Sequence, residues 1–277
     1  MQRESPSLKA TSKSSRADLR NRLEELYRAY HKRCYVHPDP LELLYRYAHP
    51  ADQEIAGIVC SSLAYGRVAQ ILSSASRALA ALGDSPAAYL RGATPAHIRI
   101  ACRGFVHRFT REAELAELLV GVKRALHAHG SLEGLFAQGL EPSARTLIGA
   151  QSAFVRTMRS FAGSRLPSLL PSPEDGSACK RLNLFLRWMV RHDEVDPGPW
   201  RCAKPAQLIV PLDTHLFRLA RALGLTDRRQ PNLKTALDVT AGFTAVSPED
   251  PLRYDFCLTR LGIRDGRTDN PEIPSVY

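Results

Sequence analysis

Residues 176–193 read GSACKRLNLFLRWMVRHD and form the most informative stretch of the chain. On a helical wheel, one side collects the apolar residues Leu182, Phe185, Leu186, Met189 and Val190. A single apolar side is typical of a helix that packs on a core. Ser177 follows a turn rich in proline and glycine, so we expect it to be the N-cap of this helix.

The opposite side of the same wheel carries Lys180, Leu184, Arg187, Trp188 and Arg191. Cations mixed with a tryptophan are typical of a surface that contacts nucleic acid. A solvated basic face with one half-exposed tryptophan explains the pattern equally well. The helix alone therefore leaves both interpretations open.

Lys180 differs from the other cations of this helix. With Ser177 as the cap it occupies the third helical position, where the positive end of the helix dipole disfavours an ammonium group. The neighbouring Arg181 acts in the same direction, and like charges favour the neutral amine of a lysine. A neutral, accessible amine can attack a carbonyl-like carbon and form a Schiff base, so Lys180 is a candidate nucleophile.

A second informative stretch is IVPLDTHLFRLARALGL, at 209–225. Asp213 is suited to cap the helix that follows, and Gly224 is suited to end it. Capping hydrogen bonds favour an ionised carboxylate, which can also stabilise a cationic transition state. The stretch predicts a capped helix, and a catalytic role for Asp213 is compatible with capping.

Helical periodicity dominates the rest of the chain, and strand-like alternation is nearly absent. Further helices are expected at 16–32, 52–63, 68–82, 112–128 and 144–161. Residues 1–17 are rich in serine and mildly basic, so we expect a disordered tail there. The pattern predicts one all-α domain over 18–277, with two helical lobes that flank a cleft.

The formal net charge of +10 favours an anionic partner such as nucleic acid. Ten Lys and Arg residues and five Asp and Glu residues lie between Ser177 and Arg229, so part of the charge is concentrated there. The six cysteines are widely spaced and form no C-x-x-C pair, which argues against a zinc site and against a disulfide framework. We expect reduced thiols, no metal and no cofactor, and no membrane span.

Two features together resemble the helix-hairpin-helix DNA glycosylase superfamily. Gly176 stands four residues before Lys180, as the hairpin glycine of that superfamily does, and VPLDTH is similar to its VPVDVH-type segment, with Asp213 at the aspartate. The 33 positions between Lys180 and Asp213 exceed the usual gap and resemble the archaeal oxoguanine glycosylase branch. Ala178 replaces the second hairpin glycine, which departs from the pattern. The whole chain also resembles a bacterial family described only as uncharacterised, through CKRLNLFLRWMVR, PLDTH, AYGR and YDF.

The glycosylase resemblance implies a base-excision repair enzyme with AP-lyase activity. Lys180 would be its nucleophile, and Asp213 would stabilise the charged sugar. The partner would be double-stranded DNA with a damaged base, such as an oxidised purine, or an abasic site. A monomer in the bacterial cytoplasm, close to the nucleoid, is expected. The flipped base requires a pocket; Trp188 is the better candidate wall, with Phe185 and Tyr65 as further candidates. Candidate DNA contacts are Gly176, Ser177, Arg181, Arg187, Arg191, His215, Arg218 and Arg67.

Three alternatives remain open at the level of sequence. His215, Arg218 and Tyr254 have an order compatible with a tyrosine recombinase, in which a tyrosine hydroxyl attacks a phosphodiester. A nucleic-acid-binding helical protein without catalysis is the second alternative. The His192–Asp193 pair is a weak signal for a metal-dependent phosphohydrolase. FVHRF (105–109) and YDF (254–256) are expected in the core, and Trp200 is either a lid or a packing residue.

Overall fold

The computed structural model of the protein describes residues 13–164, 166 and 168–264, and within these it is almost entirely helical. The all-α class predicted from the sequence is confirmed. In its first half the α-helices are α1 (Lys13–Tyr30), α2 (Pro50–Ser62), α3 (Val68–Ala80), α4 (Pro86–Gly92), α5 (Pro95–Ala101) and α6 (Glu112–His129). In its second half they are α7 (Leu132–Ala137), α8 (Ile148–Ala162), α9 (Lys180–Val190), α10 (Thr214–Ala222), α11 (Leu233–Thr244) and α12 (Asp255–Arg264).

Short 3-10 turns and one small hairpin complete the fold. The turns are Arg33–Tyr35, Pro40–Arg46, Pro173–Asp175 and Pro205–Gln207. The hairpin pairs β1 (Val106–His107) with β2 (Thr110–Arg111) in antiparallel register. None of the six cysteines forms a disulfide. No helix in the described ranges is long and apolar enough to cross a membrane.

The predicted disordered tail is wrong in part. Residues 13–17 belong to α1, which starts three residues earlier than the periodicity indicated. Residues 1–12 of that tail lie outside the described residues.

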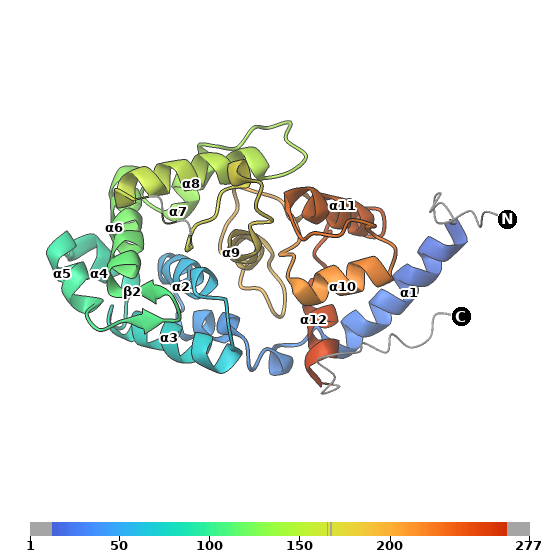
Figure 1. The fold of residues 1–277 in the computed structure, drawn as a ribbon, viewed down its shortest axis with the longest axis horizontal. Helices are drawn as coiled ribbons and strands as arrows, with labels where there is room; N and C mark the ends of the chain where they lie inside the picture. Colours follow the sequence, from blue (N-terminus) through green and yellow to red (C-terminus); the bar gives the residue numbers. More distant parts are fainter. Residues whose placement is uncertain (1–12, 165, 167, 265–277) are drawn as a thin grey trace.

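Helix α9 lies at the centre of the molecule and is viewed almost end-on in Figure 1. Gly57 of α2 lets α9 approach closely, since a Cβ at this position would lie 2.8 Å from Met189 Cε. On another side, Asn183 of α9 accepts a hydrogen bond from Gln151 of α8 at 2.7 Å. On a third side, Arg187 pairs with Asp255 of α12 at 2.7 Å. Elements from distant parts of the sequence therefore surround α9, and this burial accounts for its apolar composition.

Candidate functional site

An open pocket of about 620 Å³ contains both Lys180 and Asp213 in its wall. The wall comes from five places in the sequence: the α2–α3 junction, the tip of the β hairpin, the loop before α9, and the starts of α10 and α11. Its lining residues are Ala64, Tyr65, Gly66, Arg108, Phe109, Ser168, Pro171, Gly176, Ser177, Ala178, Cys179, Lys180, Arg181, Leu212, Asp213, Thr214, Pro231 and Asn232. Two residues 33 positions apart thus share one cavity.

Lys180 is the first residue of α9 and follows a tight turn. Cys179 precedes it in the left-handed region, with φ +48°, a conformation that non-glycine residues rarely adopt. The buried amide of Asn183 holds this turn by donating to Ala178 O at 3.0 Å. Strained backbone of this kind is concentrated at functional sites.

The predicted capping role of Ser177 is wrong. Its hydroxyl accepts from Cys179 N at 3.1 Å, and Cys179 itself occupies the N-cap position without a side-chain capping bond. The left-handed turn at Cys179 delays the helix by two residues. Lys180 is therefore the first helical residue instead of the third, and it remains at the positive end of the helix.

The two cations at the start of α9 also reach the C-terminal end of α2. Lys180 Nζ donates to Ala64 O at 3.4 Å, and Arg181 Nη1 donates to Ser62 O at 3.3 Å. Carbonyls at the end of a helix attract cations, so this end of α2 compensates for the unfavourable start of α9. Burial lowers the pKa of Arg181, whose guanidinium also lies 5.1 Å from the centre of the Tyr65 ring.

Asp213 caps α10 as predicted. Its Oδ1 accepts from Leu216 N at 2.8 Å, and Gly224 follows the helix with φ +68°. Asp213 is half-buried, and no other described residue donates a hydrogen bond to its carboxylate. One oxygen thus holds the helix, while the residue also belongs to the pocket wall.

Three helices begin at this pocket. Asn232 caps α11 by accepting from Thr235 N at 3.1 Å, and it lines the pocket together with the starts of α9 and α10. The turn at Gly176 is tied to this third helix, since Leu233 N donates to Gly176 O at 3.1 Å. Helix N-termini carry partial positive charge. Together with Lys180 and Arg181 they make the pocket suited to an anionic ligand.

Trp188 and Phe185 do not line the pocket. Both lie in the core, at 1% and 0% exposure, and Phe185 packs edge-on against Trp200 with ring centroids 5.3 Å apart. The prediction that Trp188 belongs to an exposed face is therefore wrong. Trp200 is also buried and donates to Glu54 at 2.7 Å, so it is a packing residue. Among the predicted base-pocket residues, only Tyr65 lines the pocket.

Arg187 and Arg191 are also internal, contrary to the wheel prediction of an exposed basic face. Their guanidinium groups share the fully buried carboxylate of Asp196. Arg187 further pairs with Asp255 at 2.7 Å, and Arg191 with Asp250 at 2.9 Å. These ion pairs join α9 to α12 and to the 193–200 segment, and they leave neither arginine available to a partner.

The remaining predicted contacts lie outside the pocket wall or at its edge. Arg67 and Arg218 are exposed and His215 is half-buried, but none of the three lines the pocket. Gly176, Ser177 and Arg181 do line it. Arg67 and Arg218 could contact a polyanion bound at the pocket only if it extended beyond the pocket.

The alternatives from the sequence find little geometric support. Tyr254 is 1% exposed and its hydroxyl donates to Glu24 at 2.7 Å, so it is not presented to a phosphodiester. Burial and the Glu24 hydrogen bond raise the pKa of Tyr254 to about 12. Asp193 pairs with His31 and Arg191, and the described residues contain no cluster of three or more metal-ligating side chains.

Phe109 was missed by sequence reasoning. FVHRF was expected in the core, and Phe105 is indeed buried, but Phe109 is 67% exposed at the tip of the hairpin. Arg108 and Phe109 form the two-residue turn between the paired residues His107 and Thr110. Two-residue hairpin turns favour Asn-Gly, Asp-Gly or another glycine pair, so the Arg-Phe sequence gave no signal for this hairpin.

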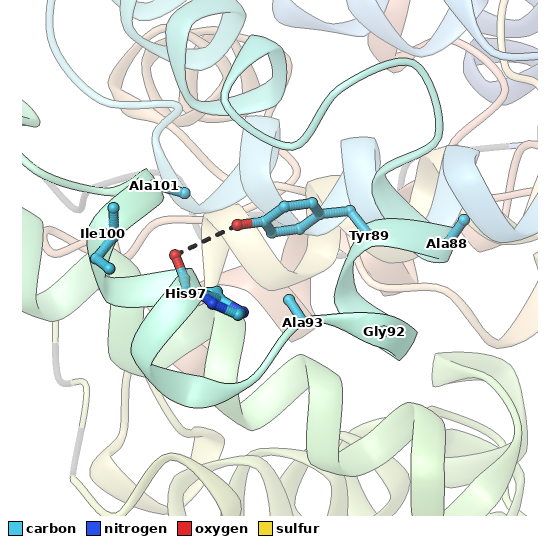
Figure 2. Close-up of a pocket in the computed structure, with 7 residues that line it drawn as sticks. All are labelled: Ala88, Tyr89, Gly92, Ala93, His97, Ile100 and Ala101. Carbon is cyan, nitrogen blue, oxygen red and sulfur yellow. Dashed lines mark hydrogen bonds between the residues drawn. The ribbon is translucent and has the colours of Figure 1, made fainter.

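A second pocket, of about 520 Å³, lies between α4 and α5 (Figure 2). Small and apolar side chains dominate its wall, and Tyr89 donates to His97 O across it at 3.3 Å. The lining residues are Ala88, Tyr89, Gly92, Ala93, His97, Ile100 and Ala101. This wall contains no carboxylate, lysine or arginine, so the chemistry of the Lys180 pocket has no counterpart here.

Comparison with known proteins identifies one family. No curated protein and no solved structure matches the chain. A family model described as "protein of unknown function (DUF2400)" matches residues 39–264, which include the pocket and every element that builds it. The match covers well over half of the sequence, and the chain therefore belongs to this DUF2400 family.

Proposed function

We propose that the protein is a DNA glycosylase with AP-lyase activity, in which Lys180 is the nucleophile and Asp213 assists. The observation that carries the proposal is that Lys180 and Asp213, from two different helices, line one open pocket. The pocket would be the cleft of a helix-hairpin-helix glycosylase-like fold with two lobes. The substrate would be double-stranded DNA with a damaged base or an abasic site, bound by a monomer in the bacterial cytoplasm near the nucleoid.

The reaction follows from the two side chains. The damaged nucleotide rotates out of the duplex into the pocket. The Lys180 amine attacks C1′ through its nitrogen lone pair, and the bond from C1′ to the base breaks, with the electron pair leaving on the base, which takes up a proton. Opening of the sugar ring gives a Schiff base between Nζ and C1′. Loss of a proton from C2′ then expels the 3′-phosphate and nicks the strand.

Asp213 would act through its charge. The carboxylate at the pocket wall can stabilise positive charge that develops on the sugar as the base departs. The cap to Leu216 N fixes the carboxylate in place, so little reorganisation accompanies the reaction. The three helix N-termini and Arg181 provide the positive field that would hold the flanking phosphates.

The test is borohydride trapping on duplexes that carry oxoguanine, uracil, an alkylated base or an abasic site. Borohydride reduces the Schiff base, so an active enzyme gives a covalent adduct that peptide mapping assigns to Lys180. Lys180→Gln should abolish the adduct while binding is retained. Lys234→Gln is the matched control, because Lys234 is an exposed lysine near the start of α11 that does not line the pocket.

Asp213→Asn separates the two roles of Asp213. Asparagine is as good an N-cap as aspartate, so α10 should persist. Base release should fall by about 10²- to 10³-fold, the usual effect of removing one electrostatic stabiliser. Trapping on an abasic site should persist, because the base has already left. The absence of any adduct on any of the duplexes would refute the catalytic proposal and favour a nucleic-acid-binding protein without catalysis.

A further inference from the structure

The tip of the β hairpin presents an aromatic ring to solvent at the edge of the Lys180 pocket. Phe109 is 67% exposed, more than any other large apolar side chain whose exposure the structure describes. Val106 on the same hairpin is 44% exposed and Val68, at the start of α3, is 38% exposed. Within the described part of the chain, three of the four large apolar side chains that are exposed therefore lie on the hairpin or at the adjoining start of α3, and the fourth is Ile100 on α5.

Phe109 is held in place despite its exposure. One face of its ring stacks on Tyr65, with centroids 5.4 Å apart and an interplanar angle of 6°. The Tyr65 hydroxyl donates to His107 O at 2.9 Å and lies 2.6 Å from Thr110 Oγ1. Tyr65 is thus bonded to both strands of the hairpin, and its ring packs against one face of Phe109.

A second set of contacts fixes the hairpin to the α2–α3 junction. The buried ring of His107 bonds Tyr65 O at 3.1 Å and Ser74 Oγ at 3.0 Å. Gly66, with φ +100°, makes room for Arg108, since a Cβ there would lie 2.8 Å from Arg108 Cδ. Keeping an aromatic ring in water forgoes the free energy of burying it. The rigid exposure of Phe109 is therefore better explained by a ligand than by stability.

The charges around the two rings indicate the kind of ligand. The Arg108 guanidinium lies 5.4 Å from the Phe109 ring centroid, and the Arg181 guanidinium 5.1 Å from that of Tyr65. Both arginines line the pocket with Lys180. An aromatic platform flanked by cations suits a flat ring joined to an anionic backbone, which is the chemistry of a nucleotide strand.

We propose that the outer face of Phe109 is a stacking platform for an unpaired nucleobase. The strand that carries this base places its phosphates on Arg108 and Arg181. The preferred partner is then nucleic acid with a locally unpaired base, and an intact duplex, whose bases are already stacked on each other, gains nothing from Phe109. This inference takes its class of partner, nucleic acid, from the proposed function. It adds that the bound strand has an unpaired base.

The test compares binding of three labelled probes: a single-stranded oligonucleotide, a duplex with one unpaired base, and an intact duplex. Phe109→Ala should weaken binding of the first two by about 5- to 150-fold, which is the usual value of one stacked base. It should leave binding of the intact duplex unchanged. Phe109→Trp should restore binding, and the bound base should quench the fluorescence that the new indole adds. Ile100→Ala is the control, because Ile100 is 52% exposed on α5, away from the hairpin.

Wild-type affinity of Phe109→Ala for all three probes would overturn the proposal. A different sedimentation coefficient for Phe109→Ala than for the wild type, both without nucleic acid, would also overturn it. The apolar patch would then be a contact between copies of the chain. The two proposals fail separately. Trapping at Lys180 with no effect of Phe109→Ala refutes only the stacking platform, whereas stacking at Phe109 without trapping on any duplex refutes only the glycosylase.

Discussion

Replacing the buried carboxylate of Asp196 tests whether the cations of α9 are structural. Asp196 has no exposed surface, and it lies between Arg187 and Arg191. Asp196→Asn keeps the shape of the side chain but removes its charge. Two buried guanidinium groups then lose the carboxylate they share.

The contacts that remain set the size of the effect. Breaking a buried ion pair costs about 3–5 kcal/mol, because the surviving charge stays uncompensated. Here Arg187 keeps Asp255 at 2.7 Å and Arg191 keeps Asp250 at 2.9 Å. We therefore expect the lower end of that range, about 3 kcal/mol of lost unfolding free energy.

Urea unfolding at neutral pH measures this loss, and the chain provides a matched control. Glu174→Gln removes a carboxylate from the exposed pair with Arg156, 3.1 Å apart, and should cost at most about 1 kcal/mol. A loss below about 1 kcal/mol for Asp196→Asn would contradict the reasoning. In that case Arg187 and Arg191 would be less buried in solution, and they would again be candidates for DNA contacts.

Three further outcomes are expected. Burial lowers the pKa of His107 below its ordinary value of about 6.5, so the unfolded chain binds more protons in acid. The unfolding free energy should then fall as the pH drops below about 6.5, and His107→Asn should make this fall less steep. The same dependence on pH in the wild type and in His107→Asn would contradict this prediction. Trp200→Phe should cost about 1–3 kcal/mol in urea unfolding because the buried Glu54 carboxylate loses a donor; an unchanged midpoint would contradict this. Gly66→Ala should lower the melting temperature more than Gly104→Ala. Both glycines have positive φ, but of the two only Gly66 has the Arg108 side chain against it. Equal decreases in melting temperature would show that Arg108 moves aside freely.

The start and the end of α10 were readable from the sequence. Asp213 and Gly224 bound α10 as predicted, because a cap and a left-handed glycine act through neighbouring residues alone. The start of α9 was misjudged because neighbouring residues alone do not set it. Cys179 adopts a left-handed conformation that its residue type does not favour. Asn183 holds this turn by donating to Ala178 O, and the distant Gln151 in turn donates to Asn183.

The sequence did not show which sides of α9 are buried. A helical wheel assumes one side in water, and it assigned Arg187 and Trp188 to that side. Helix α9 lies at the centre of the fold (Figure 1), so its polar residues find internal partners instead. The local signs were the acidic residues that follow the helix, Asp193 and Asp196, which both bond to Arg191 directly after its last turn.

The two ends of α9 therefore carry charge for opposite reasons. At its C-terminal end, Arg187 and Arg191 are neutralised by buried carboxylates that fix the helix within the fold. At its N-terminal end, Lys180 makes one long hydrogen bond within the described part of the chain, to Ala64 O, and it lines a pocket shared with Asp213. A lysine placed at the positive end of a rigid helix gains no stability from that position. The ion pairs at the C-terminal end instead hold α9 in place within the fold, and the proposed nucleophile would require such a rigid support.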